Sequence, residues 1–430
     1  MEACEKGLGG APYGLIGRKL GHSWSPRIHE RLGSRPYALL ELEPEEVEPF
    51  LRGGAWRGLN VTIPYKLDAA RIADVCSDAV RALGAANTLV RTDDGSIVAE
   101  NTDVLGFSWM LTRFCRERLG RSPREALEGR DVLVLGSGGA GRAVRYALES
   151  FAGAQASVIS RGGPDGYEGL ASRHPGAALI VNTTPVGMYP NCPDSPLDED
   201  TLTSFPDLAG VLDVVYNPAR TGLVLLAGRL GIPAESGLAM LVAQALYASE
   251  LFQGTTLGDE LVESIEHEIL SQAENVVLIG MPGAGKTSCG RELAHLLGRP
   301  FVDLDDALAL ETGRSAAQII EEDGERAFRA VETAVARDYG SRSGLVIACG
   351  GGIVTQAENL DLLRQNGRIV FLDRPLNELS ADGRPVSQSR GIERLAAERM
   401  GLYRSWADVT LRCTGSPSGD AEAARRALGL

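Results

Sequence analysis

Short apolar runs alternate along the chain with longer amphipathic segments. The strand-like runs fall at residues 13–17, 37–43, 58–64, 87–91, 131–136, 156–160, 178–185 and 210–218, and again at residues 276–280, 346–352 and 368–373. Segments long enough to form helices separate most of these runs, for example at residues 103–119. Strands separated by helices of this length indicate right-handed βαβ crossovers and parallel sheets. The pattern therefore predicts an α/β protein, with a main boundary near residue 274 between two self-sufficient blocks.

Length and composition narrow the class of protein. The chain has 430 residues, enough for about three domains, and carries 43 Lys and Arg against 57 Asp and Glu. The formal net charge of −14 argues against nucleic acid or an anionic membrane as a partner. No apolar run approaches the ~18–20 residues of a membrane span, and residues 1–14 lack the apolar core of a secretory signal.

Cysteine and glycine usage refine this picture. The seven cysteines stand singly with no CxxC pair, so we expect neither a disulfide framework nor a zinc site, and a reducing compartment. The 52 glycines exceed ordinary usage, and excess glycine is useful where backbone must approach phosphate. We therefore expect a cytoplasmic enzyme that uses nucleotides. The oligomeric state stays open.

A first glycine loop follows the run at residues 131–136. Gly136, Gly138 and Gly141 fit G-x-G-x-x-G before a helix, which is typical of a dinucleotide-binding turn. The expected cofactor contacts in this loop are Gly136, Ser137, Gly138, Gly139 and Ala140.

The end of the next strand bears on the choice of cofactor. An NAD site usually places an acid there, whereas this strand ends in Ser160 and Arg161, with Asp165 beyond the turn. Arg161 could pair with a 2′-phosphate, so we predict NADP, with Ser160 and Arg161 as contacts. A solvated surface arginine is the alternative interpretation.

Five further motifs accompany this loop. They are GHSWSPRIH (21–29), NVTIPYK (60–66), GAANT (84–88), NTDVLG (101–106) and GLAMLVAQ (237–244). Residues 12–273 thereby resemble the shikimate dehydrogenase family. The resemblance implies a substrate domain of residues 1–108 plus 236–273, and an NADP-binding Rossmann domain of residues 109–235. One departure is the sequence Ser160-Arg161-Gly162, where the family usually has Asn-Arg-Thr.

The chemistry of ketone reduction agrees with this resemblance. The reaction needs a hydride and a proton for the developing alkoxide, and Lys66 can supply the proton if its pKa is brought toward neutrality. The resemblance makes Lys66 and Asp103 the catalytic pair; a surface salt bridge is the alternative. The remaining implied contacts are Ser23, Ser25 and Tyr216 for the substrate carboxylate, Thr62, Asn87 and Gln244 for ring hydroxyls, and Gly237 for the cofactor.

A second glycine loop reads GMPGAGKT from Gly280 to Thr287, a complete G-x-x-x-x-G-K-[ST] between a strand and a helix. Its amides would hold phosphates, Lys286 would reach the β- and γ-oxygens, and Thr287 would ligate Mg²⁺. The expected nucleotide contacts are Gly283, Ala284, Gly285, Lys286, Thr287 and Ser288. The motif indicates ATP or GTP and leaves the acceptor open.

The remaining pattern, over residues 276–408, resembles the shikimate kinase family. The resemblance implies a P-loop, NMP-kinase-like α/β domain of residues 275–430 that uses ATP. It makes Asp303 a second-shell magnesium group and Asp305, with Lys286, a catalytic residue. The other implied contacts are Arg329, Gly351 and Arg399 for shikimate and the lid residue Arg384 for ATP.

Together these features predict a fused pair of enzymes that reduces 3-dehydroshikimate with NADPH and then phosphorylates shikimate. One alternative is a quinate-preferring NAD dehydrogenase joined to another small-metabolite kinase. Another is a catalytically inactive binding or scaffold protein. The presence of Lys66, Asp103, Lys286 and Asp303 speaks against the inactive alternative.

Overall fold

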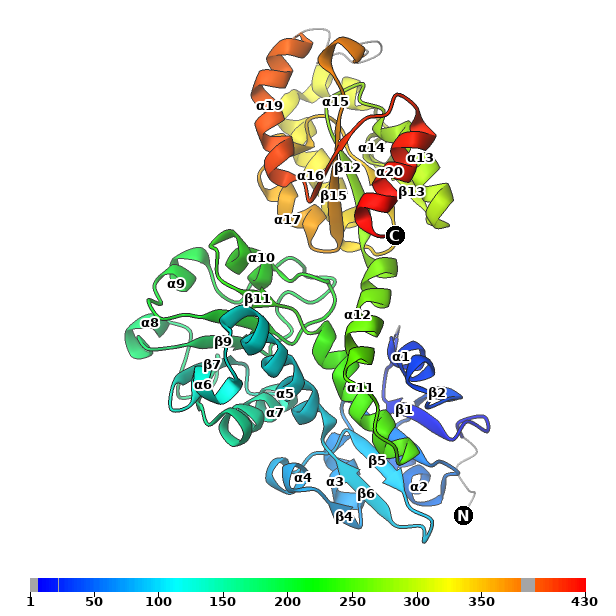
Figure 1. Cartoon of the computed structure of the whole chain (residues 1–430), viewed down its shortest axis with the longest axis vertical. Coiled ribbons are helices and arrows are strands. Elements are labelled where there is room, and N and C mark those ends of the chain that lie inside the picture. The colour runs from blue at the N-terminus through cyan, green and yellow to red at the C-terminus, as the bar shows by residue number, and fades with distance from the viewer. Residues whose placement is uncertain (1–6, 22, 380–390) are drawn as a thin grey trace. The chain divides into compact units, whose positions relative to one another are not determined.

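The computed structural model describes residues 7–21, 23–379 and 391–430 (Figure 1). The chain divides into two compact units. The first comprises Met1–Val186, Ser195–Tyr216 and Leu226–Glu268, and the second comprises Gly187–Asp194, Asn217–Leu225 and Ile269–Leu430. Both contain sheets of largely parallel strands covered by helices, which confirms the predicted α/β class.

The first sheet of the first unit is mixed. Its strands, in spatial order, are β2 (Tyr37–Glu41), β1 (Tyr13–Gly17), β3 (Gly58–Val61), β5 (Thr88–Arg91), β6 (Ile97–Glu100) and β4 (Val75–Cys76). The helices between them are α1 (Ser25–Leu32), α2 (Pro44–Gly53), α3 (Lys66–Ile72) and α4 (Asp78–Leu83). The pairs β3–β5 and β5–β6 are antiparallel, so the prediction of a parallel sheet is wrong here. The apolar pattern missed β6: a tight turn joins it to β5, and so short a connection joins only antiparallel strands, which accounts for the β5–β6 pair.

The second sheet of this unit is wholly parallel. Its strands, in spatial order, are β11 (Ala234–Glu235), β10 (Gly210–Asp213), β9 (Leu179–Asn182), β7 (Asp131–Leu135) and β8 (Gln155–Ile159). The accompanying helices are α6 (Pro123–Leu127), α7 (Gly139–Ala147), η2 (Leu148–Ala152), α8 (Leu170–Arg173), α9 (Glu199–Thr203) and α10 (Gly222–Arg229). The strand order reverses at β7, whose carboxyl end leads into the first glycine loop. Such a reversal opens a crevice at the carboxyl ends of the strands.

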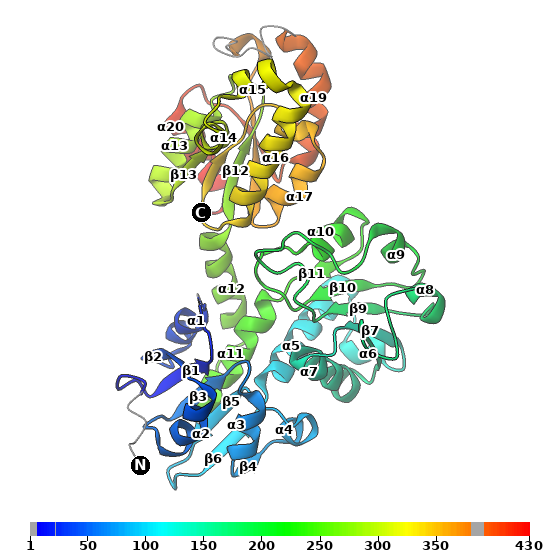
Figure 2. The same ribbon diagram turned by 180° about the vertical axis from the view of Figure 1, so that it is seen from behind.

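Two helix systems join these sheets. They are α5 (Thr102–Phe114), which continues into η1 (Cys115–Leu119), and α11 (Leu238–Gln253), followed by α12 (Glu260–Ala273). Figures 1 and 2 show α5 and α11 side by side, and their packing buries Phe107, Met110 and Met240. Helices α5 and α11 both begin next to the crevice. The side chains of their first turns therefore point toward this crevice.

The second unit contains the third sheet, in which all strand pairs are parallel. Its strands, in spatial order, are β13 (Phe301–Asp303), β14 (Val346–Ala348), β12 (Asn275–Ile279), β15 (Gly367–Asp373) and β16 (Val409–Arg412). One face packs on α13 (Lys286–Leu297) and α20 (Pro417–Leu428). The other packs on α14 (Leu304–Thr312), α15 (Ala316–Asp323), α16 (Glu325–Ser341), η3 (Ile353–Thr355), α17 (Glu358–Arg364) and α19 (Ile392–Trp406), with η4 (Leu376–Glu378) after β15 (Figures 1 and 2). Along β12, Val276 and Leu278 face the first group while Val277 and Ile279 face the second, so these four consecutive residues are all apolar.

The described residues also show the character of the helices and the state of the cysteines. Within the described residues, no helix is both long and apolar enough to cross a membrane. The six cysteines in the described part of the chain are all free thiols.

Candidate active sites

An acid–base pair lies at the crevice of the first unit. Lys66 opens α3 and Asp103 lies in the first turn of α5, and the Lys66 Nζ lies 2.5 Å from the Asp103 Oδ2. The other carboxylate oxygen of Asp103 accepts from the Asn87 Nδ2 at 2.9 Å. Both side chains of the pair are about three-quarters buried or more, at 25% and 19% exposed. The ammonium group is therefore held by an anion beside a cavity, a geometry suited to proton transfer.

Every residue predicted to contact the substrate of this half lines one cavity of about 390 Å³. Besides the Lys66–Asp103 pair, these residues are Ser23, Ser25, Thr62, Asn87, Tyr216 and Gln244. The hydroxyls of Ser23 and Ser25 lie 3.1 Å apart, so the two side chains converge on one point. The Asn87 Oδ1 accepts from the Thr102 amide at 2.7 Å, which fixes the direction of its amide group.

Sequence reasoning missed two polar residues of this cavity. Lys19, exposed in the loop after β1, adds a cation near the serine pair. Asn60, in the same motif as Lys66, is buried and accepts from the Tyr37 Oη at 2.8 Å. Asn60 belonged to a motif already identified, whereas nothing in the sequence around Lys19 marked it.

The first glycine loop has the backbone geometry that a dinucleotide site requires. Gly136 adopts φ of 110°, and a Cβ on Gly141 would lie 2.3 Å from the Gly136 carbonyl oxygen, so α7 packs tightly on β7. Gly138 is the N-cap of α7, and a Cβ on it or on Gly139 would meet nothing within 4 Å. The loop is thus open on the side where backbone amides can approach a pyrophosphate.

The same loop opens onto the substrate cavity. Ala140 and Gly237 both line that cavity, which brings the expected cofactor loop next to Lys66. Ser137 precedes Gly138 in the loop.

Two further expected cofactor contacts, Ser160 and the exposed Arg161, directly follow β8. The Ser160 amide donates to the Asp165 carbonyl at 3.0 Å. The residues present therefore fit NADP(H).

The second glycine loop, in the second unit, curls around the side chain of its own lysine. Gly283 and Gly285 adopt φ of 86° and 93°, and the Lys286 Nζ donates to the carbonyls of Gly280 and Met281 at 2.9 and 3.1 Å. Ala284, Lys286, Thr287 and Ser288 lie in the same turn, at or just before the first residues of α13. Such a loop presents amides and an ammonium group to phosphates.

A magnesium position is marked by two side chains beside this loop. The Thr287 Oγ1 donates to the Asp303 Oδ2 at 2.7 Å, and the Asp303 Oδ1 accepts from the Asp305 amide at 3.0 Å. Mg²⁺ at a nucleotide site is usually bound by one or two protein groups together with water and phosphate oxygens. The residues present thus fit a nucleotide–Mg²⁺ complex.

A cavity of about 420 Å³ adjoins this loop. Lys286, Asp305, Arg329, Gly351 and Arg399 line it, so all the expected acceptor contacts meet there. Desolvation by the cavity walls, and next the charge of Asp303, raise the pKa of Asp305, although its side chain keeps solvent contact at the mouth. A carboxylate with a raised pKa beside a phosphate loop is suited to accepting a hydroxyl proton.

Two buried arginines form one wall of this cavity. The Arg329 Nη1 donates to the Glu332 Oε2 at 2.6 Å, and the Arg399 Nη1 donates to the Gly351 carbonyl at 3.0 Å. A Cβ on Gly352 would lie 2.2 Å from the Arg329 Nη1, so only glycine leaves room for this guanidinium. Arg384, which the resemblance implied as a lid residue, lies outside the described residues.

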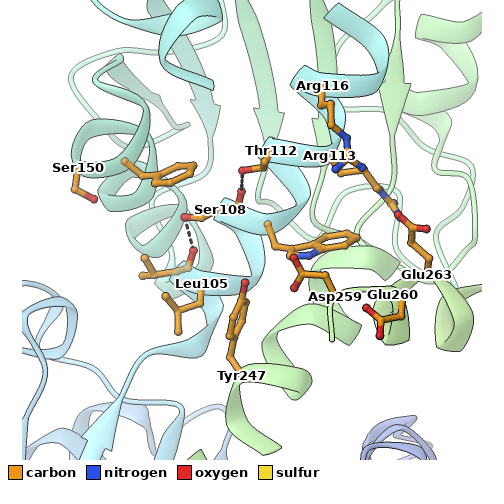
Figure 3. A pocket seen from close by; sticks show the side chains of 13 residues that line it. Leu105, Ser108, Thr112, Arg113, Arg116, Ser150, Tyr247, Asp259, Glu260 and Glu263 are labelled. Atoms are coloured by element: carbon orange, nitrogen blue, oxygen red, sulfur yellow. Dashed lines mark hydrogen bonds between the residues drawn. The ribbon is translucent and has the colours of Figure 1, made fainter. Parts of the chain in front are cut away.

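A further cavity of about 660 Å³ lies along α5, apart from both sites (Figure 3). Tyr247 and the acids Asp259 and Glu260 stand along it, and Ser150 lies on the other side of α5. Its buried cation, Arg113, is already held by Glu235 and Glu266. The described lining combines neither an acid–base pair nor a glycine loop, so we assign no reaction to it.

Comparisons with known proteins identify relatives of both parts of the chain. The family model for the shikimate dehydrogenase substrate binding domain matches residues 15–89, and the shikimate kinase model matches residues 282–428. The shikimate dehydrogenase (NADP(+)) of Clostridium beijerinckii is 32% identical over 273 residues, which are 59% of this chain and 96% of that protein.

Solved structures show the same fold. A chorismate mutase/shikimate 5-dehydrogenase fusion protein from Clostridium acetobutylicum matches with a TM-score of 0.53 and 32% identity, over 60% of this chain and 97% of that one. The shikimate 5-dehydrogenase of Thermus thermophilus, solved in complex with NADP(H) and shikimate, matches with a TM-score of 0.50 and 29% identity, over 60% and 98%. The N-terminal part of the chain therefore belongs to the shikimate dehydrogenase family, and a shikimate kinase domain follows it in the same chain.

Proposed function

We propose that the chain catalyses two consecutive reactions: NADPH-dependent reduction of 3-dehydroshikimate to shikimate, and phosphorylation of shikimate to shikimate 3-phosphate from ATP with Mg²⁺. The observation that carries the proposal is the Lys66–Asp103 pair at 2.5 Å, in a cavity shared with a dinucleotide loop, in a chain that also has a kinase P-loop. The first reaction makes the acceptor of the second.

In the reductase, NADPH supplies the hydride when bound. Lys66 donates the proton to the forming alkoxide at the ketone oxygen, and its positive charge stabilises that oxygen. Asp103 orients the ammonium group and binds a substrate hydroxyl, while its contact with Asn87 keeps it in place. All three side chains face the same cavity.

The remaining polar groups of that cavity orient the substrate. Ser23 and Ser25, 3.1 Å apart, bind the carboxylate together with Tyr216. Thr62 and Gln244, with Asn87, bind the ring hydroxyls. For the cofactor, the loop of Gly136, Ser137, Gly138, Gly139 and Ala140 would bind the pyrophosphate, and Ser160 and Arg161 would bind the 2′-phosphate. Gly237, which lines the same cavity as Ala140, would add a further cofactor contact.

In the kinase, the P-loop residues Gly283 to Ser288 bind the ATP phosphates, with Lys286 at the transferred group. Thr287 and Asp303 hold the hydrated Mg²⁺. Asp305 accepts the proton of the shikimate hydroxyl, and Arg329 and Arg399 bind its carboxylate beside Gly351. We also assign Arg384 to the ATP lid.

We propose a three-domain organisation to match. Residues 1–108 plus 236–273 form the substrate domain, residues 109–235 form the NADP domain, and residues 275–430 form the kinase. The catalytic residues of the reductase are then contributed by helices that begin at the crevice between its two sheets.

A coupled assay tests the proposal. Purified protein receives 3-dehydroshikimate, NADPH, ATP and Mg²⁺, and loss of NADPH and formation of ADP are followed together. ADP should form only when NADPH is present or when shikimate is supplied. Formation of ADP without either compound, or NADPH loss with quinate-series substrates only, would contradict the assignment.

A further inference from the structure

A compact ionic cluster supports the loop that carries Arg161. The loop spans residues 160–166 after β8, and Asp165 is the first acid that follows that strand. An acid at the end of this strand usually binds the ribose 2′-hydroxyl of NAD. Asp165 lies beyond the turn and not at the strand end, but its negative charge would repel a 2′-phosphate that came close to it. The partners of Asp165 therefore bear on which cofactor the chain accepts.

The carboxylate of Asp165 is held by the end of α8. Its Oδ1 accepts from the Arg173 Nε at 2.9 Å, and its Oδ2 lies 2.6 Å from the His174 Nε2. The opposite ring nitrogen of His174, Nδ1, lies 2.6 Å from the Asp131 Oδ2 at the start of β7. Arg173 also donates to the Gly166 carbonyl at 2.6 Å, so the cluster fixes the far end of the loop.

This geometry defines the protonation state of His174. Both ring nitrogens face carboxylate oxygens, which only accept, and a neutral imidazole has a single N–H. Burial works to lower the pKa of His174, but the hydrogen bonds to Asp165 and Asp131 and their charges raise it overall above 6.5. The hydrogen bond from His174 likewise lowers the pKa of Asp165.

The surroundings of the ring contain few other charges. Asp131 of β7 and Asp165 of the loop face it directly, and Arg173 of α8 acts through Asp165. From β8, the Ser157 hydroxyl donates to the Asp131 Oδ1 at 2.8 Å. Among the described residues, no contact joins Asp165 to Arg161.

We propose that His174 and Arg173 are positioning residues for cofactor selection: they bind the Asp165 carboxylate, keep it away from the adenosine ribose, and leave Arg161 for the 2′-phosphate of NADPH. The inference rests on the proposed NADPH-dependent reduction. Without the imidazolium, Arg173 alone holds the Asp165 carboxylate, through Oδ1, and Oδ2 becomes available to Arg161 or to a ribose hydroxyl. Affinity for NADPH then falls, whereas affinity for NADH stays constant or rises.

Direct binding measurements test this, using the fluorescence of the reduced nicotinamide and the full chain. His174→Gln should weaken NADPH binding about tenfold or more, because one charge-assisted hydrogen bond to Asp165 is lost, and change the Kd for NADH less than threefold. The double variant His174→Gln with Asp165→Asn should recover most of the NADPH affinity. Arg124→Gln, which removes an exposed ion pair with Glu128 in the same unit, is the matched control and should change neither Kd.

A pH series adds a readout that a purely structural role does not predict. The imidazolium is present below the raised pKa of His174, so the preference of the wild type for NADPH over NADH should fall as pH rises through that value. The series starts at about pH 7, where the 2′-phosphate is already mostly dianionic. In His174→Gln the preference should not change with pH over this range.

Several outcomes would overturn the proposal. They are an unchanged NADPH Kd in His174→Gln, an equal loss of NADPH and NADH binding, and no recovery in the double variant. If His174→Gln does not fold, Arg173→Met, whose side chain is 42% exposed, takes its place with the same expected pattern. Because binding is measured without turnover, failure of the reductase assignment would appear separately, as NADPH binding without reduction of 3-dehydroshikimate.

Discussion

Replacement of Lys66 by methionine tests the proposed proton donor. Methionine keeps an unbranched stem in the cavity but has no proton and no charge. General-acid catalysis contributes about 10²–10⁴-fold, so the barrier should rise by about 2.7–5.5 kcal/mol. The fold should tolerate the change, because the partner Asp103 retains the hydrogen bond from Asn87 and is 19% exposed to water. We expect a loss of stability of no more than about 1–3 kcal/mol.

The assay uses the second active site as an internal control. Shikimate-dependent reduction of NADP⁺ should fall by the stated factor, while ADP formation from supplied shikimate stays within twofold of the wild type. Lys19→Met serves as the contrasting variant: Lys19 lines the same cavity but is not paired with Asp103, so its loss should raise the KM for shikimate more than it lowers kcat. A Lys66→Met enzyme that keeps more than half of the wild-type turnover would refute the assignment of the proton donor.

Three other outcomes are expected. Arg161→Ala should weaken NADPH binding by about tenfold or more, with NADH binding unchanged, and equal effects on both would point to another phosphate ligand. Asp305→Asn should lower the rate of phosphoryl transfer by about 10²–10⁴-fold. In the wild type this rate should fall as pH drops through the raised pKa of Asp305, because only the carboxylate can accept the proton. The pH–rate profile of the variant should lack this acidic fall in rate. Arg113→Met leaves the largely buried Glu235 and Glu266 without their cation. The free energy of unfolding, measured by chemical denaturation, should therefore fall by about 3–5 kcal/mol. A fall below about 1 kcal/mol would contradict the interpretation of these contacts as buried ion pairs.

The local patterns in the sequence predicted the parts of the fold that depend on neighbouring residues. β7 begins and ends within one residue of the predicted run, and the glycine loop after it has the expected turn at Gly136. Both follow from short-range rules, in which apolar runs form buried strands and glycine permits a positive φ. The hairpin of β5 and β6 was missed, because β6 has only four residues and weak alternation.

Side-chain partnerships between distant segments were harder to predict. The pair of Lys66 and Asp103 could be named only because a family resemblance linked two motifs 37 residues apart. The cluster of Asp131, Asp165 and His174 has no such motif, and its members come together only when β7, the loop and α8 pack. Sequence patterns report an element's own periodicity, whereas these contacts depend on the register between elements.

The path of the chain through its first unit has a consequence for synthesis on the ribosome. Phe252, at the end of α11, stacks on Tyr13 of β1 at 5.4 Å and fills the space above Gly58, while Gln253 donates to the Leu32 carbonyl at 3.0 Å. Tyr13 and Phe252 are 239 residues apart, which at about 5–20 residues per second corresponds to roughly 10–50 s of translation. All strands of the parallel sheet, β7 to β11, are synthesised within that interval. The mixed sheet is synthesised earlier, but α11, which covers it, is made only afterwards. The mixed sheet, although synthesised before the parallel one, is therefore completed after it, and its uncovered face is accessible to chaperones and proteases for longer.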